Sequence, residues 1–171
     1  MARLGSVTLL SAGSYAPPLS TAVQRLKYQG RPDVATPLAR WLAGSPVVAT
    51  ALRGLSLVPV PLHSSRLAER GYNQSSLLAA QLGRALGLHV RANCLQRVRA
   101  TPAQAKSSAA ERAQNVVGAF AASGPAPTCV ALVDDVVTTG ATALACMAAL
   151  ERAGSKVSAI VTVCATTMRD C

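Results

Sequence analysis

The chain has 171 residues, of which 50% are hydrophobic and 14% are charged. This length fits one domain that can bury most of its apolar surface, and the composition excludes a disordered chain. The net charge of +10 indicates affinity for phosphates, nucleic acid or acidic membranes without choosing among them, and a general bias toward Arg explains it equally well.

The five cysteines form no CxxC pair and have no pair of histidines nearby, so we expect no zinc site. Such a set is typical of reduced, mostly buried thiols, and we therefore expect a cytoplasmic protein. The apolar run that ends at Leu10 is too short for a signal peptide, and no segment reaches the roughly 20 apolar residues of a membrane span. A membrane is thus not an expected partner.

The first part of the chain is predicted to form two helices and a strand. Residues 19–28 have apolar positions on one helical face, and Lys27 would complement the dipole at the end of that helix. A short helix is predicted over residues 34–42. Residues 56–61 form a buried strand that must open into a loop, since a strand interior cannot hold its two prolines.

The remaining elements alternate helix and strand. A helix over residues 75–86 follows Asn73, a good N-cap, and its core face would hold Leu77, Leu78, Leu82 and Leu86. The later elements are a strand at 90–98, a loop at 99–110, a helix from a capping box at Ser108 to Val116, a turn at 124–127, a strand at 129–133, a helix at 141–153 and a strand at 157–164.

The last strand, helix and strand form a βαβ unit. We therefore predict an α/β fold with one domain over residues 1–171. Its central sheet would be mostly parallel with helices on both faces, and the N-terminal helices would form a small attached hood.

The run over residues 130–142 carries the clearest chemistry. An apolar strand is predicted to end at two adjacent carboxylates, Asp134 and Asp135, at the edge where open α/β sheets bind ligands. A loop then leads into a helix, and its amides and hydroxyls would form a cradle for a phosphate. The residues of this cradle are Thr138, Thr139, Gly140, Ala141 and Thr142.

Phosphate donors beside acceptors for two vicinal hydroxyls fit a ribose 5-phosphate. The carboxylates would accept from the hydroxyls, and Gly140 would let the backbone approach the phosphate closely. The alternative is an ordinary strand-to-helix turn with a threonine cap. A Walker A loop is excluded because no lysine follows Gly140.

This run resembles the phosphoribosyl pyrophosphate (PRPP) motif of type I phosphoribosyltransferases. The resemblance implies that Asp134 and Asp135 hold the ribose hydroxyls and that residues 138–142 hold the 5-phosphate. Roughly from residue 14 to residue 165, the chain is also similar to the ComF family of phosphoribosyltransferase-like proteins. The segments that carry this similarity are 26–30, 58–63, 66–74, 97–104 and 111–120.

Two features depart from that family. ComF-type proteins often start with a four-cysteine zinc module, which this sequence lacks, so the zinc-linked part of the family's role is not carried over. Lys106 and Ser107 stand where a glycine and a leucine are expected, which adds a positive charge to the loop.

The strand exit at Pro61, Leu62 and His63 resembles the loop that binds pyrophosphate in these enzymes. Its amides would bind the ligand, and a plain strand exit is the alternative. His63 is either a general base or a surface residue without a role. Arg66 and Arg70 lie four positions apart and would face the pyrophosphate from one helical turn, or form a solvated basic face.

Arg97, Arg99 and Lys106 lie in or beside the loop at 99–110. In the superfamily that the resemblance indicates, such a loop folds over the site and excludes water. Its cations would then stabilise the leaving pyrophosphate in the closed state. The alternative is a flexible basic loop without function.

These residues lead us to expect a protein that binds PRPP with Mg²⁺, with no direct metal ligands beyond Asp134 and Asp135. It would transfer the 5-phosphoribosyl group to an acceptor and release pyrophosphate. The acceptor would rest on the N-terminal helices and near Tyr72, and no motif names it. The alternatives are a non-catalytic PRPP or nucleotide sensor and a ComF-like competence or DNA-uptake factor. A homodimer is left open, and nucleic acid is the less favoured partner.

Overall fold

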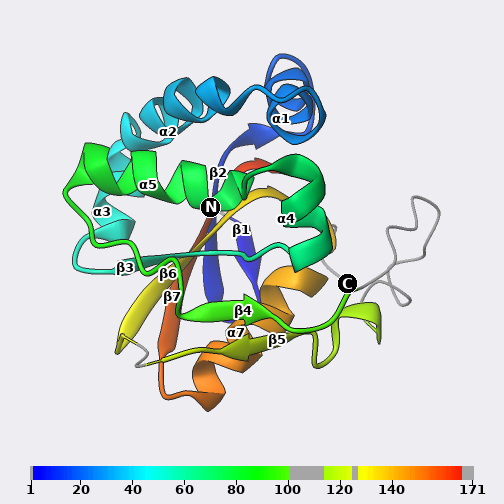
Figure 1. Cartoon of the computed structure of the whole chain (residues 1–171). Helices are drawn as coiled ribbons and strands as arrows, with labels where there is room; N and C mark the ends of the chain where they lie inside the picture. The colour runs from blue at the N-terminus through cyan, green and yellow to red at the C-terminus, as the bar shows by residue number, and fades with distance from the viewer. Residues whose placement is uncertain (1, 101–113, 125–126, 167–171) are drawn as a thin grey trace.

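Five strands form the central sheet of the computed structural model, which describes residues 2–100, 114–124 and 127–166 (Figure 1). Their order is β1-β2-β7-β6-β3, and every neighbouring pair is parallel except β1 with β2. The predicted mostly parallel sheet is thus confirmed. The strand bounds are β1 Ala2–Leu4, β2 Val7–Ser14, β3 Ser56–Pro59, β6 Cys129–Val137 and β7 Lys156–Ala165.

Apolar runs produce the two central strands. Val130, Leu132 and Ile160 are fully buried, as expected for parallel strands covered on both faces. The register pairs Asp134 of β6 with Thr162 of β7, so the acidic residues lie within the paired part of the sheet.

One face of the sheet is covered by helices from the first half of the chain (Figure 1). The predicted amphipathic helix over residues 19–28 is confirmed, because Leu19, Val23 and Leu26 are all buried. The N-terminal helices share one apolar core with α5, so they form part of this helical layer. The elements are α1 Leu19–Tyr28, η1 Pro32–Val34, α2 Ala35–Ala43, α3 Pro46–Leu52 and α5 Gln74–Leu86.

The opposite face is covered by α7 Ala141–Arg152 and by a two-stranded sheet (Figure 1). That sheet pairs β4 Leu95–Arg97 with β5 Phe120–Ala122 in antiparallel fashion. Cys146 and Leu150 of α7 pack with Phe120 in the core of this face. Helices on both faces confirm the α/β class.

Some boundaries differ from the sequence prediction. The strand predicted to end at the two carboxylates continues through Asp134 and Asp135 to Val137. The strand predicted at 90–98 is reduced to β4 and to one bridge between Val90 and Leu57. In α5, Leu77 and Leu86 are only half-buried, because the core face is centred on other positions of the helix.

Several elements were absent from the prediction, namely the β1-β2 hairpin, η1, α3, α4 Ser64–Arg70 and β5. The β1-β2 hairpin occupies the N-terminal edge of the sheet, and β2 pairs with β7. Helix α3 begins after Ser45, whose hydroxyl accepts from the amide of Val48, and Pro46 stands at its first position. No helix within the described ranges is both long and apolar enough to cross a membrane.

Candidate functional site

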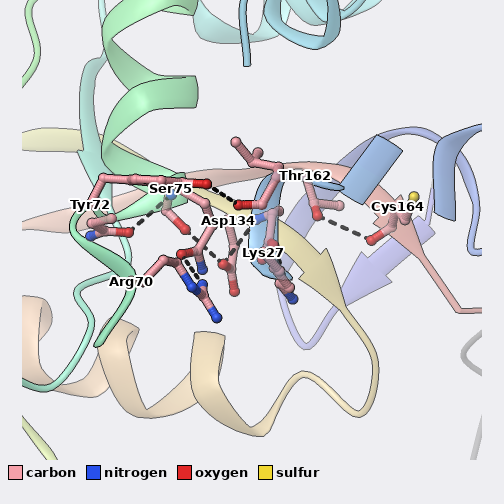
Figure 2. A network of polar contacts seen from close by, with 11 residues as sticks. Lys27, Arg70, Tyr72, Ser75, Asp134, Thr162 and Cys164 are labelled. Atoms are coloured by element: carbon pink, nitrogen blue, oxygen red, sulfur yellow. Dashed lines mark hydrogen bonds and ion pairs between the residues drawn. The ribbon is translucent and has the colours of Figure 1, made fainter. Parts of the chain in front are cut away.

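The acid pair, Asp134 and Asp135, lies in the last third of β6. Neighbouring residues of a strand point to opposite faces, so the two carboxylates leave the sheet in different directions. They are 9% and 2% exposed. Oδ1 of Asp134 accepts from the hydroxyl of Ser75 at 3.0 Å and from the amide of Asp135 at 2.9 Å (Figure 2). Ser75 stands in the first turn of α5, which places that helix start beside the strand end.

Asp135 forms an ion pair with Lys27. The distance from Nζ to Oδ2 is 3.0 Å, and the side chain of Lys27 is 22% exposed. Burial disfavours the charge on Lys27, but the carboxylates of Asp135 and Asp134 outweigh it and raise its pKa. Lys27 therefore stays a cation. The sequence indicated only a helix-dipole role for this lysine, because its partner lies far along the chain.

Asp134 does not titrate like a surface carboxyl. Burial, followed by the nearby charge of Asp135, raises the pKa of Asp134 to about 7. Lys27 and the hydrogen bonds from Asp135 and Ser75 oppose that rise. Asp134 thus exchanges its proton near neutral pH, which is a property of many functional carboxyls.

Residues 138–142, called the phosphate loop here after their predicted role, lead from β6 into the first turn of α7. Gly140 has a φ of +77° and is the N-cap of α7, which confirms the unusual dihedral expected there. A Cβ at Gly140 would collide with the side chain of Leu4, so β1 packs directly against the loop. The amide of Ala141 donates to Oγ1 of Thr139 at 3.4 Å. Amides in the first turn of a helix have no acceptor within the helix, which is the physical reason for the predicted phosphate site.

A cationic cavity of about 270 Å³ opens beside the acid pair. Four cationic side chains from α1, α4 Ser64–Arg70 and β4 line it. Arg66 and Arg70 both line it, and their predicted contact with pyrophosphate stays a prediction. The lining residues are Lys27, Tyr28, Leu62, His63, Ser65, Arg66, Arg70, Gln74, Arg97 and Ala100.

His63 caps helix α4. Its Nδ1 accepts from the amide of Ser65 at 3.3 Å and lies 2.9 Å from that residue's hydroxyl. Because Nδ1 must keep a lone pair for the amide, a neutral His63 carries its hydrogen on Nε2. His63 thus combines a capping role with a place in the cavity wall, whereas Pro61 lies outside that wall.

Arg70 is held at the rim of the cavity. It donates to Oε1 of Gln74, and its guanidinium lies 5.6 Å from the ring centre of Tyr28. The Tyr28 side chain is 73% exposed. A cation over an aromatic ring is a stabilising arrangement that leaves its remaining donors free to point toward an anion.

Two of the three predicted loop cations, Arg97 and Arg99, lie within the described residues and have different surroundings. Arg97 is half-buried, 5.4 Å above the ring of Phe120, and burial lowers its pKa. Arg99 donates to the carbonyls of Asn115 and Val117 at 3.2 and 2.6 Å, so it joins the two ends of the loop. Lys106 lies outside the described residues, as does most of the predicted loop.

The segment before α5 holds the site together. Asn73 caps α5 by accepting from the amide of Ser75 at 3.0 Å, which confirms the predicted cap. Its amide nitrogen also donates to the carbonyl of Val60 at 3.0 Å. The hydroxyl of Tyr72 donates to the carbonyl of Leu26 at 2.7 Å, next to Lys27. This segment therefore links the end of α1, the exit of β3 and the start of α5.

Across residues 2–100, 114–124 and 127–166, no three His, Cys, Asp or Glu side chains gather into a group that could hold a metal ion.

Comparison with known proteins identifies relatives over most of the chain, although no family model matches it. A DNA utilization protein YhgH of Salmonella typhimurium is 39% identical over 163 residues, which are 92% of this chain and 72% of that protein. Its Escherichia coli K12 counterpart is 36% identical over the same shares. A competence protein F of Haemophilus influenzae is 40% identical over 138 residues, 76% of this chain and 60% of that protein. The chain therefore belongs to the ComF family.

Proposed function

We propose that the chain binds PRPP and transfers its 5-phosphoribosyl group to an acceptor. The ribose would lie at the acid pair, the 5-phosphate at the phosphate loop and the pyrophosphate in the cationic cavity. The observation that supports this proposal is the position of Lys27. Its side chain lines the cavity, and its Nζ lies 3.0 Å from Oδ2 of Asp135. Diol acceptors and an anion site thus lie within the reach of one side chain, as a ligand with adjacent hydroxyls and pyrophosphate requires.

The residues around the cavity suit a leaving pyrophosphate. In the transfer, the bond from C1 of the ribose to a pyrophosphate oxygen breaks, and pyrophosphate leaves with the electron pair. The acceptor forms the new bond at C1 and loses a proton if its nucleophilic atom carries one. Arg66 and Arg70 would stabilise the charge that develops on pyrophosphate, and the carboxylate of Asp134 would favour the cationic sugar.

Mg²⁺ fits this site through its oxygen chemistry. It prefers carboxylate, phosphate and water oxygens, and the acid pair offers carboxylates only. Asp134 and Asp135 would hold the ion together with PRPP, and it would neutralise part of the pyrophosphate charge. Asp135 could bind the ion only if Lys27 moved away from Oδ2, since that carboxylate is 2% exposed.

Calorimetric titration with PRPP and Mg²⁺ tests the binding step. We expect saturable binding that is lost in a variant with Asp134→Asn and Asp135→Asn, whereas Asp33→Asn, at an exposed site on η1, leaves it unchanged. Absence of binding at millimolar PRPP would reject the proposal. Release of pyrophosphate with a panel of nucleobases and amines then separates a transferase from a sensor, because a sensor binds PRPP and releases none.

A role in the use of DNA is the second candidate, supported by the names of the relatives and by the net charge of +10. Single-stranded DNA would then bind in a salt-dependent manner. Binding that the double Asn variant leaves unchanged would place DNA outside the acid pair. Loss of DNA binding in the presence of PRPP would instead place both ligands at one site.

A further inference from the structure

Lys27 stands between the two parts of the proposed site. Its ammonium lies 3.0 Å from Oδ2 of Asp135, and its side chain forms part of the cavity wall. Asp135 is 2% exposed, so a ribose hydroxyl cannot reach Oδ2 while the ammonium occupies that place. In this arrangement the ammonium of Lys27 blocks access to the carboxylate of Asp135.

We propose that Lys27 is a positioning residue that couples the ribose and pyrophosphate halves of the ligand. Lys27 leaves Asp135 when the ribose hydroxyls bind, and its ammonium turns into the cavity to meet pyrophosphate. This proposal rests on the proposed function. It explains how the site would distinguish PRPP from a sugar phosphate or a pyrophosphate alone.

The charges around Lys27 give the reason for this coupling. An ammonium that leaves Asp135 enters a cavity already lined by Arg66, Arg70 and Arg97. Like charges repel, so this move is unfavourable in an empty cavity and favourable when pyrophosphate occupies it. A ribose phosphate alone must therefore displace Lys27 against repulsion. Pyrophosphate removes that cost, and each ligand raises the affinity for the other.

The local structure lets the side chain move while its helix stays in place. The hydroxyl of Tyr72 donates to the carbonyl of Leu26 at 2.7 Å, which fixes the end of α1 against the segment before α5. Lysine has a long flexible stem and three rotatable donors. The ammonium can thus exchange one anion for the other through side-chain rotation alone.

Binding of the two halves of PRPP tests the proposal in the unmodified chain. Ribose 5-phosphate and inorganic pyrophosphate, each with Mg²⁺, are titrated alone and in the presence of the other. We expect each to increase the affinity of the other on the order of tenfold. If PRPP binds and its two halves bind independently of one another, the coupling proposal is overturned and the proposed function stands. If none of the three ligands binds, both fail.

Substitutions at Lys27 assign the coupling to this residue. In Lys27→Met the two halves should bind independently, with pyrophosphate weakened and ribose 5-phosphate not weakened. Lys27→Arg should restore much of the coupling, since it returns the charge. Arg25→Met is the matched control, because it removes a charge from the exposed side of the same helical turn and should keep the coupling. Full coupling in a folded Lys27→Met protein would overturn the proposal. If that variant does not fold, the titrations of the unmodified chain with the two halves of PRPP decide whether the coupling exists.

Discussion

The acid pair and the cationic cavity differ in how the protein satisfies their charges. Asp134 and Asp135 are nearly inaccessible, and their partners are Ser75, Lys27 and a backbone amide. The cavity is open, and four cationic side chains share its wall. Under the proposed function, Arg66 and Arg70 would meet an anion from where they stand, whereas the acid pair would first exchange an internal partner for a ligand.

This difference has consequences for stability. Groups that satisfy each other inside the protein contribute to folding, whereas an exposed cation such as Arg66 contributes little. Changes at the acid pair or at its partner Lys27 should therefore alter the free energy of unfolding, whereas changes at an exposed cavity residue such as Arg66 should alter ligand affinity.

Loss of the ammonium of Lys27 should have the largest effect on stability. Lys27→Met leaves the buried carboxylate of Asp135 without its cation, and breaking a buried pair in this way costs roughly 4 kcal/mol. Urea denaturation measures the loss. Adding Asp135→Asn should recover part of it, and Arg25→Met should change stability by less than about 0.5 kcal/mol. An equally small effect of Lys27→Met would show that the two regions do not differ.

The pH dependence of stability should reveal Asp134. Its folded-state pKa is about 7, above the roughly 3.9 of an exposed Asp. The folded protein therefore holds this proton more tightly than the unfolded chain, and stability falls as pH rises from about 4 to about 7. Above pH 7 the full cost of the buried charge is present.

Asp134→Asn should remove that cost. The variant should be more stable than the unmodified chain at pH 8, on the order of 3 kcal/mol, and should lose this advantage toward pH 4. Denaturation at both pH values measures the change. Asp33→Asn, at an exposed carboxyl, should give no gain at pH 8. A gain for Asp134→Asn that is the same at both pH values would contradict a raised pKa.

The phosphate loop belongs with the acid pair in this comparison, because the protein packs it tightly. Gly140→Ala should cost about 2 kcal/mol, from its positive φ and from the collision with Leu4. Gly154→Ala is the control, since Gly154 has a φ of +87° and open space around it. It should cost about half as much. Equal costs at both glycines would indicate that Leu4 moves aside freely.

Local patterns predicted most of the fold. Helices α1 and α5 follow from apolar spacing and caps, and the central strands follow from short apolar runs. The hairpin over β1 and β2 was missed, although Gly5 between the short segments is a signal for a tight turn, and its φ is +59°. A three-residue strand has too few positions for alternation to be visible.

The sequence indicated which side chains to expect at the candidate site, but it did not indicate which residues contact them. Two adjacent acids before a Thr-Thr-Gly run indicated a ligand site. The charge of the same two acids also led us to end the predicted strand there, which was wrong. The strand continues because Ser75 and Lys27 satisfy the carboxylates from other elements. Such long-range partners have no local signature in one sequence. The ligand-binding roles of the acid pair, the phosphate loop, the cavity residues and Lys106 stay predictions.

Removal of Arg66, an exposed cation of the cavity, should have the smallest effect on stability and so sharpens the comparison. Arg66 is 41% exposed, and its nearest acid, Glu69, lies 3.7 Å away at the surface. Such pairs contribute little, so Arg66→Gln should change the free energy of unfolding by less than about 0.5 kcal/mol. Its affinity for pyrophosphate should nevertheless fall roughly fivefold, since one charged donor is lost. Arg84→Gln, in a groove between α2 and α5, removes the same charge and should preserve that affinity. A clear loss of stability in Arg66→Gln with unchanged affinity for pyrophosphate would contradict this prediction. It would show that Arg66 has a structural role, as the acid pair does.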